Sequence, residues 1–235
     1  MTKTALLDGD IIVYRCGFAS DAGAKRQGIE HEPIEHCLHS VKLLMGSIVD
    51  GAGCDGYRVF LTGRNNYRDD IATIQKYKDR PSRKPVHYQA IRDYLIHSHR
   101  AEVSDGNEAD DSLGRAQTED TVICTLDKDL DMVPGWHFKW TKNQLYNIGP
   151  TEGLRNFYEQ LLKGDRTDSI PGLPGIGDKK AAQALRGVTK EENMWRVAQH
   201  MYNKHSSYDY YDILEIGNLL WIQQQGRLQW TPPSA

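Results

Sequence analysis

The chain has 235 residues, of which 39% are apolar and 26% are charged, and its formal net charge is −3. This globular composition suffices for one domain with a small subdomain. We expect no membrane partner, because no apolar run approaches the ~18 residues of a membrane span and no signal peptide opens the chain. The four scattered cysteines lack the spacing of a zinc site, so we expect reduced thiols in a cytoplasmic protein.

The N-terminal segment predicts a short buried strand over residues 4–7 that stops at two acids, Asp8 and Asp10. In open α/β sheets, ligands bind at the carboxyl ends of the strands, although an Asp-Gly turn alone would also explain the pattern. Apolar periodicity then predicts a helix over 11–18, a polar loop over 20–33 and a second helix over 34–49.

A second strand is predicted over residues 57–61, followed by a loop at 62–64. Seven Arg or Lys residues lie within 64–84, and tyrosines interleave with them. Cations with aromatic neighbours suit a nucleic-acid strand, although a solvated charged helix is the alternative. A helix beginning near Pro85 and a short strand over 101–103 follow.

Clustered acids follow the next predicted strand ends. Glu108, Asp110 and Asp111 crowd the start of a helix predicted from residue 110, where the helix dipole alone would favour them. Three carboxylates within four residues also repel one another, which favours a bound cation. Asp129 and Asp131 follow the clearest buried strand, 121–125, and two edge strands are predicted within 138–146.

The C-terminal part begins with a predicted helix over 151–163 and two further carboxylates, Asp165 and Asp168. A Gly- and Pro-rich run, 172–177, then predicts a hairpin turn that leads into a helix with two lysines in its first turn. Free backbone N–H groups and lysines suit phosphate, although a loop between two helices is the simpler interpretation. Helices are predicted over 191–202 and 208–225, and the tail 230–235 is predicted to be exposed or disordered.

The acidic groups predict a metal site. Strand ends converge in an α/β sheet, so carboxylates far apart in the sequence can share one pocket. Oxygen ligands select Mg²⁺ or Mn²⁺ over zinc. Two such ions could activate a water and stabilise the leaving oxygen during phosphodiester hydrolysis.

Five motifs together resemble the flap-endonuclease/5′-nuclease family, and within it the 5′→3′ exonucleases of short-tailed phages. They are LDGD (7–10), YKDR (77–80), EADD (108–111), DKDLD (127–131) and GDRTDSIPGLPGIGDKKAAQAL (164–185). The resemblance covers nearly the whole chain. It implies an α/β, PIN-like fold with a mostly parallel central sheet flanked by helices. A nuclease core over 1–150, with a basic arch near 64–100, would precede a helix-three-turn-helix DNA-binding region over 151–235.

The resemblance also implies residue roles. Lys78 matches the catalytic lysine, with Arg80 or Arg83 as its partner. Two Mg²⁺ ions, or Mn²⁺ in their place, would be held by the family's carboxylates, which correspond to Asp8, Glu108, Asp110, Asp111, Asp129, Asp131, Asp165 and Asp168. The positions expected to contact DNA, with K⁺ possible at the hairpin, are Arg15, Gly172, Gly175, Ile176, Gly177, Lys179 and Lys180.

The expected activity is therefore a metal-dependent 5′→3′ DNA exonuclease or structure-specific 5′ nuclease. We expect a monomer that acts on duplex DNA with a 5′ end or flap, in phage DNA replication or degradation. A flap endonuclease as the main activity, a PIN-type ribonuclease and a non-catalytic DNA-binding module remain as alternatives.

Overall fold

The computed structural model describes residues 2–79 and 83–233, and the chain divides into two compact units. Unit 1 comprises Met1–Asn65, Pro81–Asp127 and Gly135–Asn147; unit 2 comprises Asn66–Arg80, Lys128–Pro134 and Ile148–Ala235. The last of these divisions lies near the boundary expected at residue 150. Two earlier segments, 66–80 and 128–134, also belong to unit 2, which local sequence patterns do not reveal.

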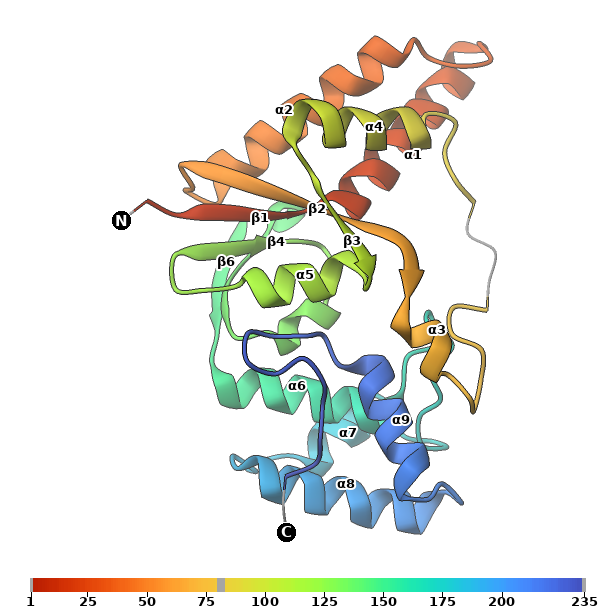
Figure 1. The fold of residues 1–235 in the computed structure, drawn as a ribbon, viewed down its shortest axis with the longest axis vertical. Coiled ribbons are helices and arrows are strands. Elements are labelled where there is room, and N and C mark those ends of the chain that lie inside the picture. Colours follow the sequence, from red (N-terminus) through yellow and green to blue (C-terminus); the bar gives the residue numbers. More distant parts are fainter. Residues whose placement is uncertain (1, 80–82, 234–235) are drawn as a thin grey trace. The chain divides into compact units, whose positions relative to one another are not determined.

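Unit 1 is built on a six-stranded sheet with the strand order β3-β2-β1-β4-β5-β6 (Figure 1). β1 pairs in parallel with β2 and β4, and β4 pairs in parallel with β5. These pairings confirm the α/β fold with a mostly parallel central sheet. The strands are β1 (Thr4–Asp8), β2 (Gly56–Asn66), β3 (Glu102–Gly106), β4 (Thr121–Cys124), β5 (Gly135–Lys139) and β6 (Gln144–Ile148).

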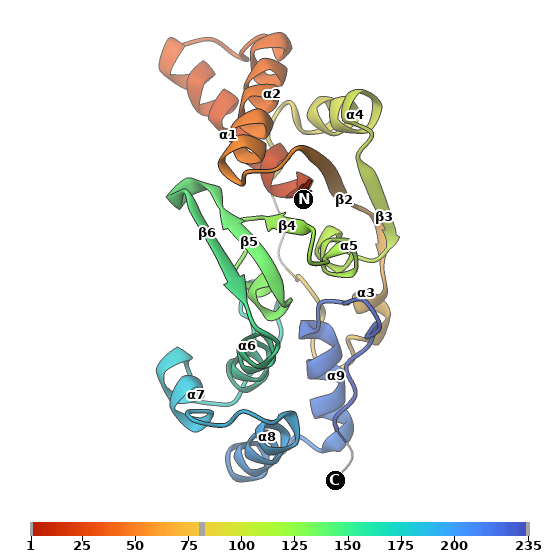
Figure 2. The ribbon, with the colours of Figure 1, turned by 90° about the vertical axis from the view of Figure 1, so that its left-hand side faces the viewer.

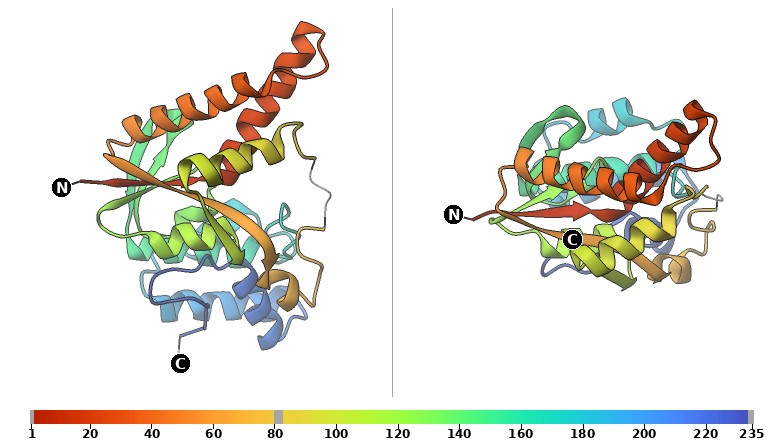
Figure 3. Two further views of the ribbon diagram at one scale, coloured as in Figure 1. Left: turned by 45° about the horizontal axis from the view of Figure 1, so that its top comes forward. Right: turned by 90° about the horizontal axis from the view of Figure 1, so that it is seen from above.

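Helices flank this sheet because alternate strand residues point to opposite faces. Ala5 and Leu7 of β1 belong to an apolar core that also contains side chains of α1, α2 and α4. Figure 3 shows α1 and α2 running side by side and antiparallel. α5 contacts β1 and β3. These helices are α1 (Gly9–Gln27), α2 (Ile34–Gly51), α4 (Tyr88–His99) and α5 (Ala109–Ala116), and a short 3₁₀ turn, η2, spans Trp140–Lys142.

The loop predicted over residues 20–33 is wrong in its first part, because α1 continues to Gln27. The polar, glycine-containing sequence suggested a loop, but Ser20, Gly23 and Ala24 are buried on the helix. Gly23 leaves room for the Glu32 carboxylate, whose oxygen would lie 2.0 Å from an added Cβ. The helix ends at Gly28, which has a φ of 68° and donates its N–H to carbonyls of the last turn.

The loop predicted at 62–64 is also wrong, because β2 continues to Asn66. Gly63 suggested a turn, but it serves close strand packing instead. A Cβ at this position would lie 2.3 Å from the backbone oxygen of Ser104 in β3. The glycine therefore lets the edge strand approach.

Unit 2 is helical, with α6 at its centre. Figure 2 shows α7, α8 and α9 around α6, and α6 contacts all three of them. The buried face of α6 includes Phe157, Tyr158, Leu161 and Leu162. The elements of unit 2 are α3 (Tyr67–Ile71), the 3₁₀ turn η1 (Asp129–Met132), α6 (Pro150–Lys163), α7 (Asp178–Ala184), α8 (Glu191–His205) and α9 (Tyr210–Leu220).

The prediction of an exposed or disordered tail is wrong for Trp230, which is completely buried in unit 2. Its ring lies 5.2 Å from that of Phe157 and 5.6 Å from that of Trp195, measured between centroids. Gly217 makes room for it, since an added Cβ would lie 2.2 Å from the indole. The Trp230 backbone N–H donates to the Asn218 side-chain oxygen at 3.1 Å. Because the residues next to Trp230 in the sequence are mostly polar, the local sequence pattern does not predict that the tryptophan is buried.

Among the helices built from residues 2–79 and 83–233, none combines the length and the apolar character that crossing a membrane requires.

Candidate functional site

The carboxylates predicted as metal ligands are divided between the two units. Unit 1 contains Asp8, Glu108, Asp110 and Asp111, and unit 2 contains Asp129, Asp131, Asp165 and Asp168. Within the described parts of the chain, no group of three or more His, Cys, Asp or Glu side chains is arranged to hold a metal ion. The metal-binding role of these residues therefore stays a prediction, and the two sets have different surroundings.

Asp8 is the last residue of β1 and the N-cap of α1. Its carboxylate accepts the Ile11 N–H at 3.1 Å and the Thr125 hydroxyl at 2.8 Å. The residue is 4% exposed. Burial, and next the neighbouring Asp10 carboxylate, raise the pKa of Asp8 to about 7. A cation at this position would favour the ionised form.

Asp10 lies in a network that joins α1, β2 and α4. Its carboxylate accepts the Thr62 N–H and an N–H of Arg92, both at 2.9 Å. Arg92 also donates to the Thr62 carbonyl at 2.7 Å. Burial raises the pKa of Asp10, and the Thr62 hydrogen bonds and the Arg92 charge oppose that shift. Sequence reasoning did not assign Asp10 to the site and missed Arg92, because the partner of Arg92 lies 82 positions away in the sequence.

Glu108 and Asp111 start α5 by a reciprocal capping box. The Glu108 N–H donates to the Asp111 carboxylate at 3.1 Å, and the Glu108 side chain accepts a backbone N–H in return. Asp111 is completely buried, and Asp110 lies in the first turn of the helix. The Ala109 N–H donates to the Thr62 hydroxyl at 3.0 Å, so Thr62 also connects β2 to this helix. All three acids therefore lie at the helix start, and two of them, Glu108 and Asp111, also form the capping box.

The predicted arginines of unit 1 lie against aromatic rings. The Arg15 guanidinium is 4.9 Å from the Trp140 ring centroid, and that of Arg83 is 5.9 Å from Phe18. Arg83, which is exposed, also pairs with the mostly buried side chain of Asp21, with Nη2 3.7 Å from Oδ2. Arg80 lies outside the described residues.

Sequence reasoning missed an aromatic group in unit 1. Tyr14 stacks on Phe18, with centroids 5.9 Å apart, and its ring centroid is 5.4 Å from that of Tyr88. The Lys84 ammonium lies 4.6 Å from the Tyr88 ring centroid. The i, i+4 spacing of Tyr14 and Phe18 in the first helix was the available signal.

In unit 2, the predicted catalytic lysine meets one of the predicted metal ligands. Lys78 Nζ lies 3.7 Å from Asp168 Oδ2, and the Lys78 N–H donates to the Asp168 carbonyl at 2.9 Å. The buried Tyr77 donates its hydroxyl to the same carboxylate at 3.0 Å. The structure thus brings the YKDR and GDRTD motifs together.

The remaining carboxylates of unit 2 lie in turns. Asp165 accepts the N–H groups of Thr167 and Asp168 at 2.6 and 3.2 Å, and it exchanges two backbone hydrogen bonds with Ile170. Asp129 and Asp131 belong to η1, where the Asp131 carbonyl accepts from the Asn156 side chain of α6 at 2.7 Å. A small hollow is lined by Lys128, Asp129, Asp131, Met132, Asn156, Glu159, Gln160 and Lys163.

In the hairpin after α6, the backbone at Gly172 passes very close to the backbone at the end of that helix. A Cβ at Gly172 would lie 2.0 Å from the Lys163 carbonyl, so only glycine fits. The Leu173 N–H donates to the Leu162 carbonyl at 2.9 Å, and Gly175 has a φ of 72°. The Lys180 ammonium donates to the Gly175 carbonyl at 2.8 Å, whereas Lys179 is exposed.

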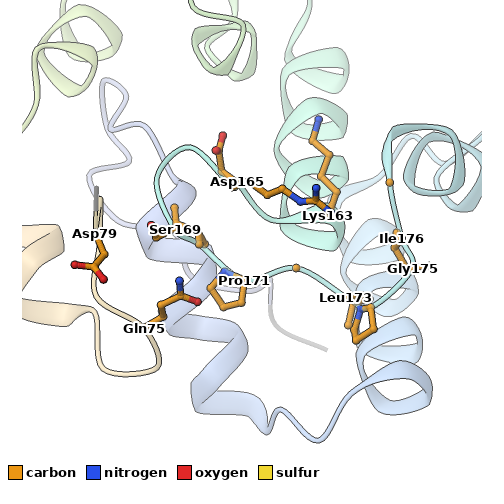
Figure 4. A pocket seen from close by; sticks show the side chains of 14 residues that line it. Gln75, Asp79, Lys163, Asp165, Ser169, Pro171, Leu173, Gly175 and Ile176 are labelled. Carbon is orange, nitrogen blue, oxygen red and sulfur yellow. The ribbon is translucent and has the colours of Figure 1, made fainter. Parts of the chain in front are cut away.

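The hairpin lines an open groove of about 580 Å³ within unit 2 (Figure 4). Gln75 and Asp79 line it from one side, and the turn with Ser169 and Pro171 lies opposite them. Gly177, the N-cap of α7, also lines the groove. Each residue predicted to contact DNA in the hairpin therefore lies on or beside this groove.

Several known nucleases and DNA polymerases are similar to this chain in sequence. No family model matches the chain. The DNA polymerase I of Bacillus caldotenax is 28% identical over 220 residues, which are 82% of this chain and 24% of the polymerase. A 5′-3′ exonuclease of Mycoplasma pneumoniae is 25% identical over 224 residues, 83% of this chain and 75% of that protein. The flap endonuclease Xni of Shewanella piezotolerans is 26% identical over 227 residues, 88% of this chain and 85% of that protein. The chain thus spans about a quarter of the length of its polymerase relatives.

Solved structures share the fold. The T5 D15 protein, co-crystallised with metal ions, has a TM-score of 0.63 at 12% identity, over 93% of this chain and 89% of that protein. A bacteriophage T5 flap endonuclease in complex with DNA and metal ions has a TM-score of 0.61 at 14% identity, over 93% and 88% of the two chains. The sequence relatives confirm the resemblance to the 5′-nuclease family that the motifs predicted, and the solved structures confirm its fold.

Proposed function

We propose that the chain is a metal-dependent nuclease that hydrolyses phosphodiester bonds at the 5′ end of DNA. The main observation behind this proposal is that Lys78 Nζ lies 3.7 Å from Asp168 Oδ2. The relatives of the chain include a 5′-3′ exonuclease and a flap endonuclease, which also supports it. The 5′→3′ exonuclease activity and the cleavage of 5′ flaps are both part of the proposal.

The carboxylates fit divalent metal ions, because they offer oxygen donors only and because Asp8 is buried with a pKa of about 7. We propose two Mg²⁺ ions, with Mn²⁺ able to substitute. Such ions, when bound, polarise a water molecule and offset charge on the phosphate oxygens. A T5 flap endonuclease of the same fold was solved with DNA and metal ions, which supports metal binding in the proposal. The proposed ligands are Asp8, Glu108, Asp110, Asp111, Asp129, Asp131, Asp165 and Asp168.

Cationic side chains of this chain would act on the phosphates. The Lys78 ammonium would contact the scissile phosphate and stabilise the charge that develops there. Arg83 or Arg80 would assist it, and Arg15 would hold a neighbouring phosphate of the strand. The basic stretch 64–84 would guide the 5′ strand as an arch.

The C-terminal region would bind duplex DNA through its backbone, as a helix-three-turn-helix element. Gly172, Gly175, Ile176 and Gly177 would present backbone groups to phosphates, and Lys179 and Lys180 would add positive charge. A K⁺ ion at the hairpin carbonyls is part of the proposal, and at Gly175 it would compete with the Lys180 ammonium. A role in phage DNA replication or degradation rests on the family resemblance, and the cytoplasmic location on the scattered cysteines; action as a monomer is part of the same proposal.

The test is digestion of 5′-labelled DNA duplexes that carry either a 5′ overhang or a 5′ flap, in Mg²⁺ or in EDTA. Metal-dependent release of mono- or short oligonucleotides supports the exonuclease, and one longer product from the flap alone indicates an endonuclease. A matched RNA duplex tests the ribonuclease alternative. Retained duplex binding without cleavage in Mg²⁺ or Mn²⁺ would contradict the enzyme and support a binding module.

Two variants test whether Lys78 contributes to cleavage. Lys78→Ala should lower cleavage by about 100-fold, because it removes a preorganised charge from the reacting phosphate. Lys204→Ala is the matched control, since this lysine is exposed in the last turn of α8. Equal activity of Lys78→Ala and the unmodified chain would remove Lys78 from the mechanism.

A further inference from the structure

The segment that carries Lys78 has little regular structure of its own. After α3 ends at Ile71, residues 72–78 form neither helix nor strand. Lys78 itself has a φ of 48°, in the left-handed region that a non-glycine residue adopts only when its surroundings hold it there. The position of its ammonium therefore depends on what fixes the segment on either side.

One fixing point is the carboxylate of Glu215 in α9. Its Oε1 accepts the N–H groups of Thr73 and Ile74 at 2.8 and 2.9 Å, and its Oε2 accepts the Thr73 hydroxyl. A single ionised side chain thus binds three donors of the segment. Hydrogen bonds to a charged acceptor are about twice as strong as neutral ones, so these three bonds hold the backbone of the segment in place. We call the contact of Glu215 with Thr73 and Ile74 the α9 clamp.

A second fixing point is Arg68 of α3, whose side chain is almost completely buried. It donates to the Leu219 carbonyl at 2.9 Å and to the Trp221 carbonyl at 2.7 Å. Carbonyls at the C-terminal end of a helix lack partners within the helix, so the guanidinium satisfies groups that α9 leaves open. Both fixing points belong to unit 2 and bind the segment to the same helix.

Beyond these points the chain runs only a few residues to Lys78. Tyr77 is buried and donates to Asp168, and the Lys78 N–H donates to the Asp168 carbonyl at 2.9 Å. The segment is therefore held at α9 on one side and at the Asp168 turn on the other. Loss of the α9 clamp would free one side while the Asp168 contacts remained.

We infer that Glu215 is a positioning residue for Lys78, acting by its hydrogen bonds to the N–H groups of Thr73 and Ile74 and to the Thr73 hydroxyl. This inference rests on the proposed function, in which Lys78 contacts the scissile phosphate. It assigns to α9 a role in the cleavage step that is separate from DNA binding by the hairpin.

The test uses Glu215→Gln in the full chain, with Glu192→Gln, an exposed glutamate of α8, as the matched control. Glutamine keeps the shape but loses the charge and one acceptor oxygen. A displacement near 1 Å at a reacting group can cost on the order of 100-fold in rate, so we expect single-turnover cleavage to fall about 10- to 100-fold. Duplex affinity should stay within about 2-fold, because the hairpin is unchanged.

Two readouts separate positioning from general stability. Hydrogen exchange at the Thr73 and Ile74 amides should accelerate, whereas the amides of α9 keep their protection. In the Lys78→Ala background, Glu215→Gln should have no further effect on cleavage, because the two residues would act as one unit. Additive losses in this double-mutant cycle would overturn the inference.

Other outcomes would also contradict it. Unchanged cleavage in Glu215→Gln, with faster exchange at residues 73 and 74, would show that the clamp does not position Lys78. If Glu215→Gln unfolds unit 2, Thr73→Val removes the hydroxyl contact alone and should lower cleavage about 3-fold; full activity of that variant would overturn the inference. Failure of the unmodified chain to cleave DNA, or full activity of Lys78→Ala, contradicts the proposed catalytic role of Lys78 and the inference with it. Loss of the Glu215 effect alone leaves the proposed function intact.

Discussion

The two units hold their acidic side chains in different ways. In unit 1, Asp8 and Asp111 are buried at helix starts, and each accepts backbone hydrogen bonds there. In unit 2, Asp165 and Asp168 lie in a turn, and Asp168 pairs with Lys78, whose side chain is 47% exposed. Burial therefore raises the pKa of Asp8 in unit 1 to about 7, whereas in unit 2 Asp168 lies beside the Lys78 ammonium. Removal of a divalent ion should accordingly affect the stability of unit 1 more than that of unit 2.

The largest effect is expected from neutralising a buried ligand. Asp8→Asn keeps an acceptor for the Ile11 N–H and a partner for the Thr125 hydroxyl, but it removes the negative charge. Cleavage should fall on the order of 1000-fold, because the substitution removes a proposed metal ligand. Duplex binding should survive, because the hairpin is unchanged. Asp129→Asn is expected to do the same from unit 2. Single-turnover kinetics and fluorescence anisotropy measure the two properties, and parallel loss of binding would count against a purely catalytic role.

The pH dependence of stability should distinguish Asp8 from the acids of unit 2. Its folded-state pKa of about 7 lies above the ordinary value of 3.8, so between these pH values the folded chain retains a proton that the unfolded chain has lost. In EDTA, stability should fall as pH rises from about 4 to 7, by on the order of 4 kcal/mol in total. Urea titrations of the unmodified chain and of Asp8→Asn give the comparison. The variant should have a much smaller slope, which comes from Asp10, whose pKa burial also raises; identical slopes would refute the assignment to Asp8.

A smaller effect is expected inside the Asp10 network of unit 1. Arg92→Gln leaves the Asp10 carboxylate without its cation, 2.9 Å away in the structure, and should lower the free energy of unfolding by about 3 kcal/mol. Arg58→Gln is the matched control on β2, because the Arg58–Glu102 pair is about half exposed on both sides. Exposed pairs contribute less than about 1 kcal/mol, so chemical denaturation should separate the two variants clearly. Equal losses of unfolding free energy in the two variants would contradict a larger contribution from the Arg92–Asp10 pair.

The smallest effect is expected at the hairpin of unit 2. Lys179→Ala removes one exposed charge and should weaken binding only a few-fold, equally for all DNA sequences. The slope of log affinity against log salt should fall by roughly 0.9, the value for one phosphate contact. Titrations of two unrelated duplexes at several salt concentrations provide the measurement. A sequence-dependent loss would contradict binding through the DNA backbone.

Local chemistry made part of the fold predictable. The apolar runs at 4–7 and 121–125 became β1 and β4, because a buried strand of a parallel sheet needs only a short continuous apolar stretch. The hairpin at 172–177 was predictable because several glycines and a proline fall within six residues, a density that is typical of turns. By the same local logic, Gly23 and Gly63 were misread as loop signals, since the partners that require a glycine there, Glu32 and Ser104, lie elsewhere in the chain.

The sequence by itself determined the strands, most of the helices, the glycine hairpin and the carboxylate motifs that resemble the 5′-nuclease family. Only the tertiary structure paired Arg92 with Asp10, 82 positions away, and Glu215 with Thr73, 142 positions away. It also buried Trp230 against Phe157 and Trp195. The physical reason is that an ion pair or a ring contact between distant segments leaves no periodicity in either segment. Such a contact becomes visible only when the chain has folded both segments onto a common core.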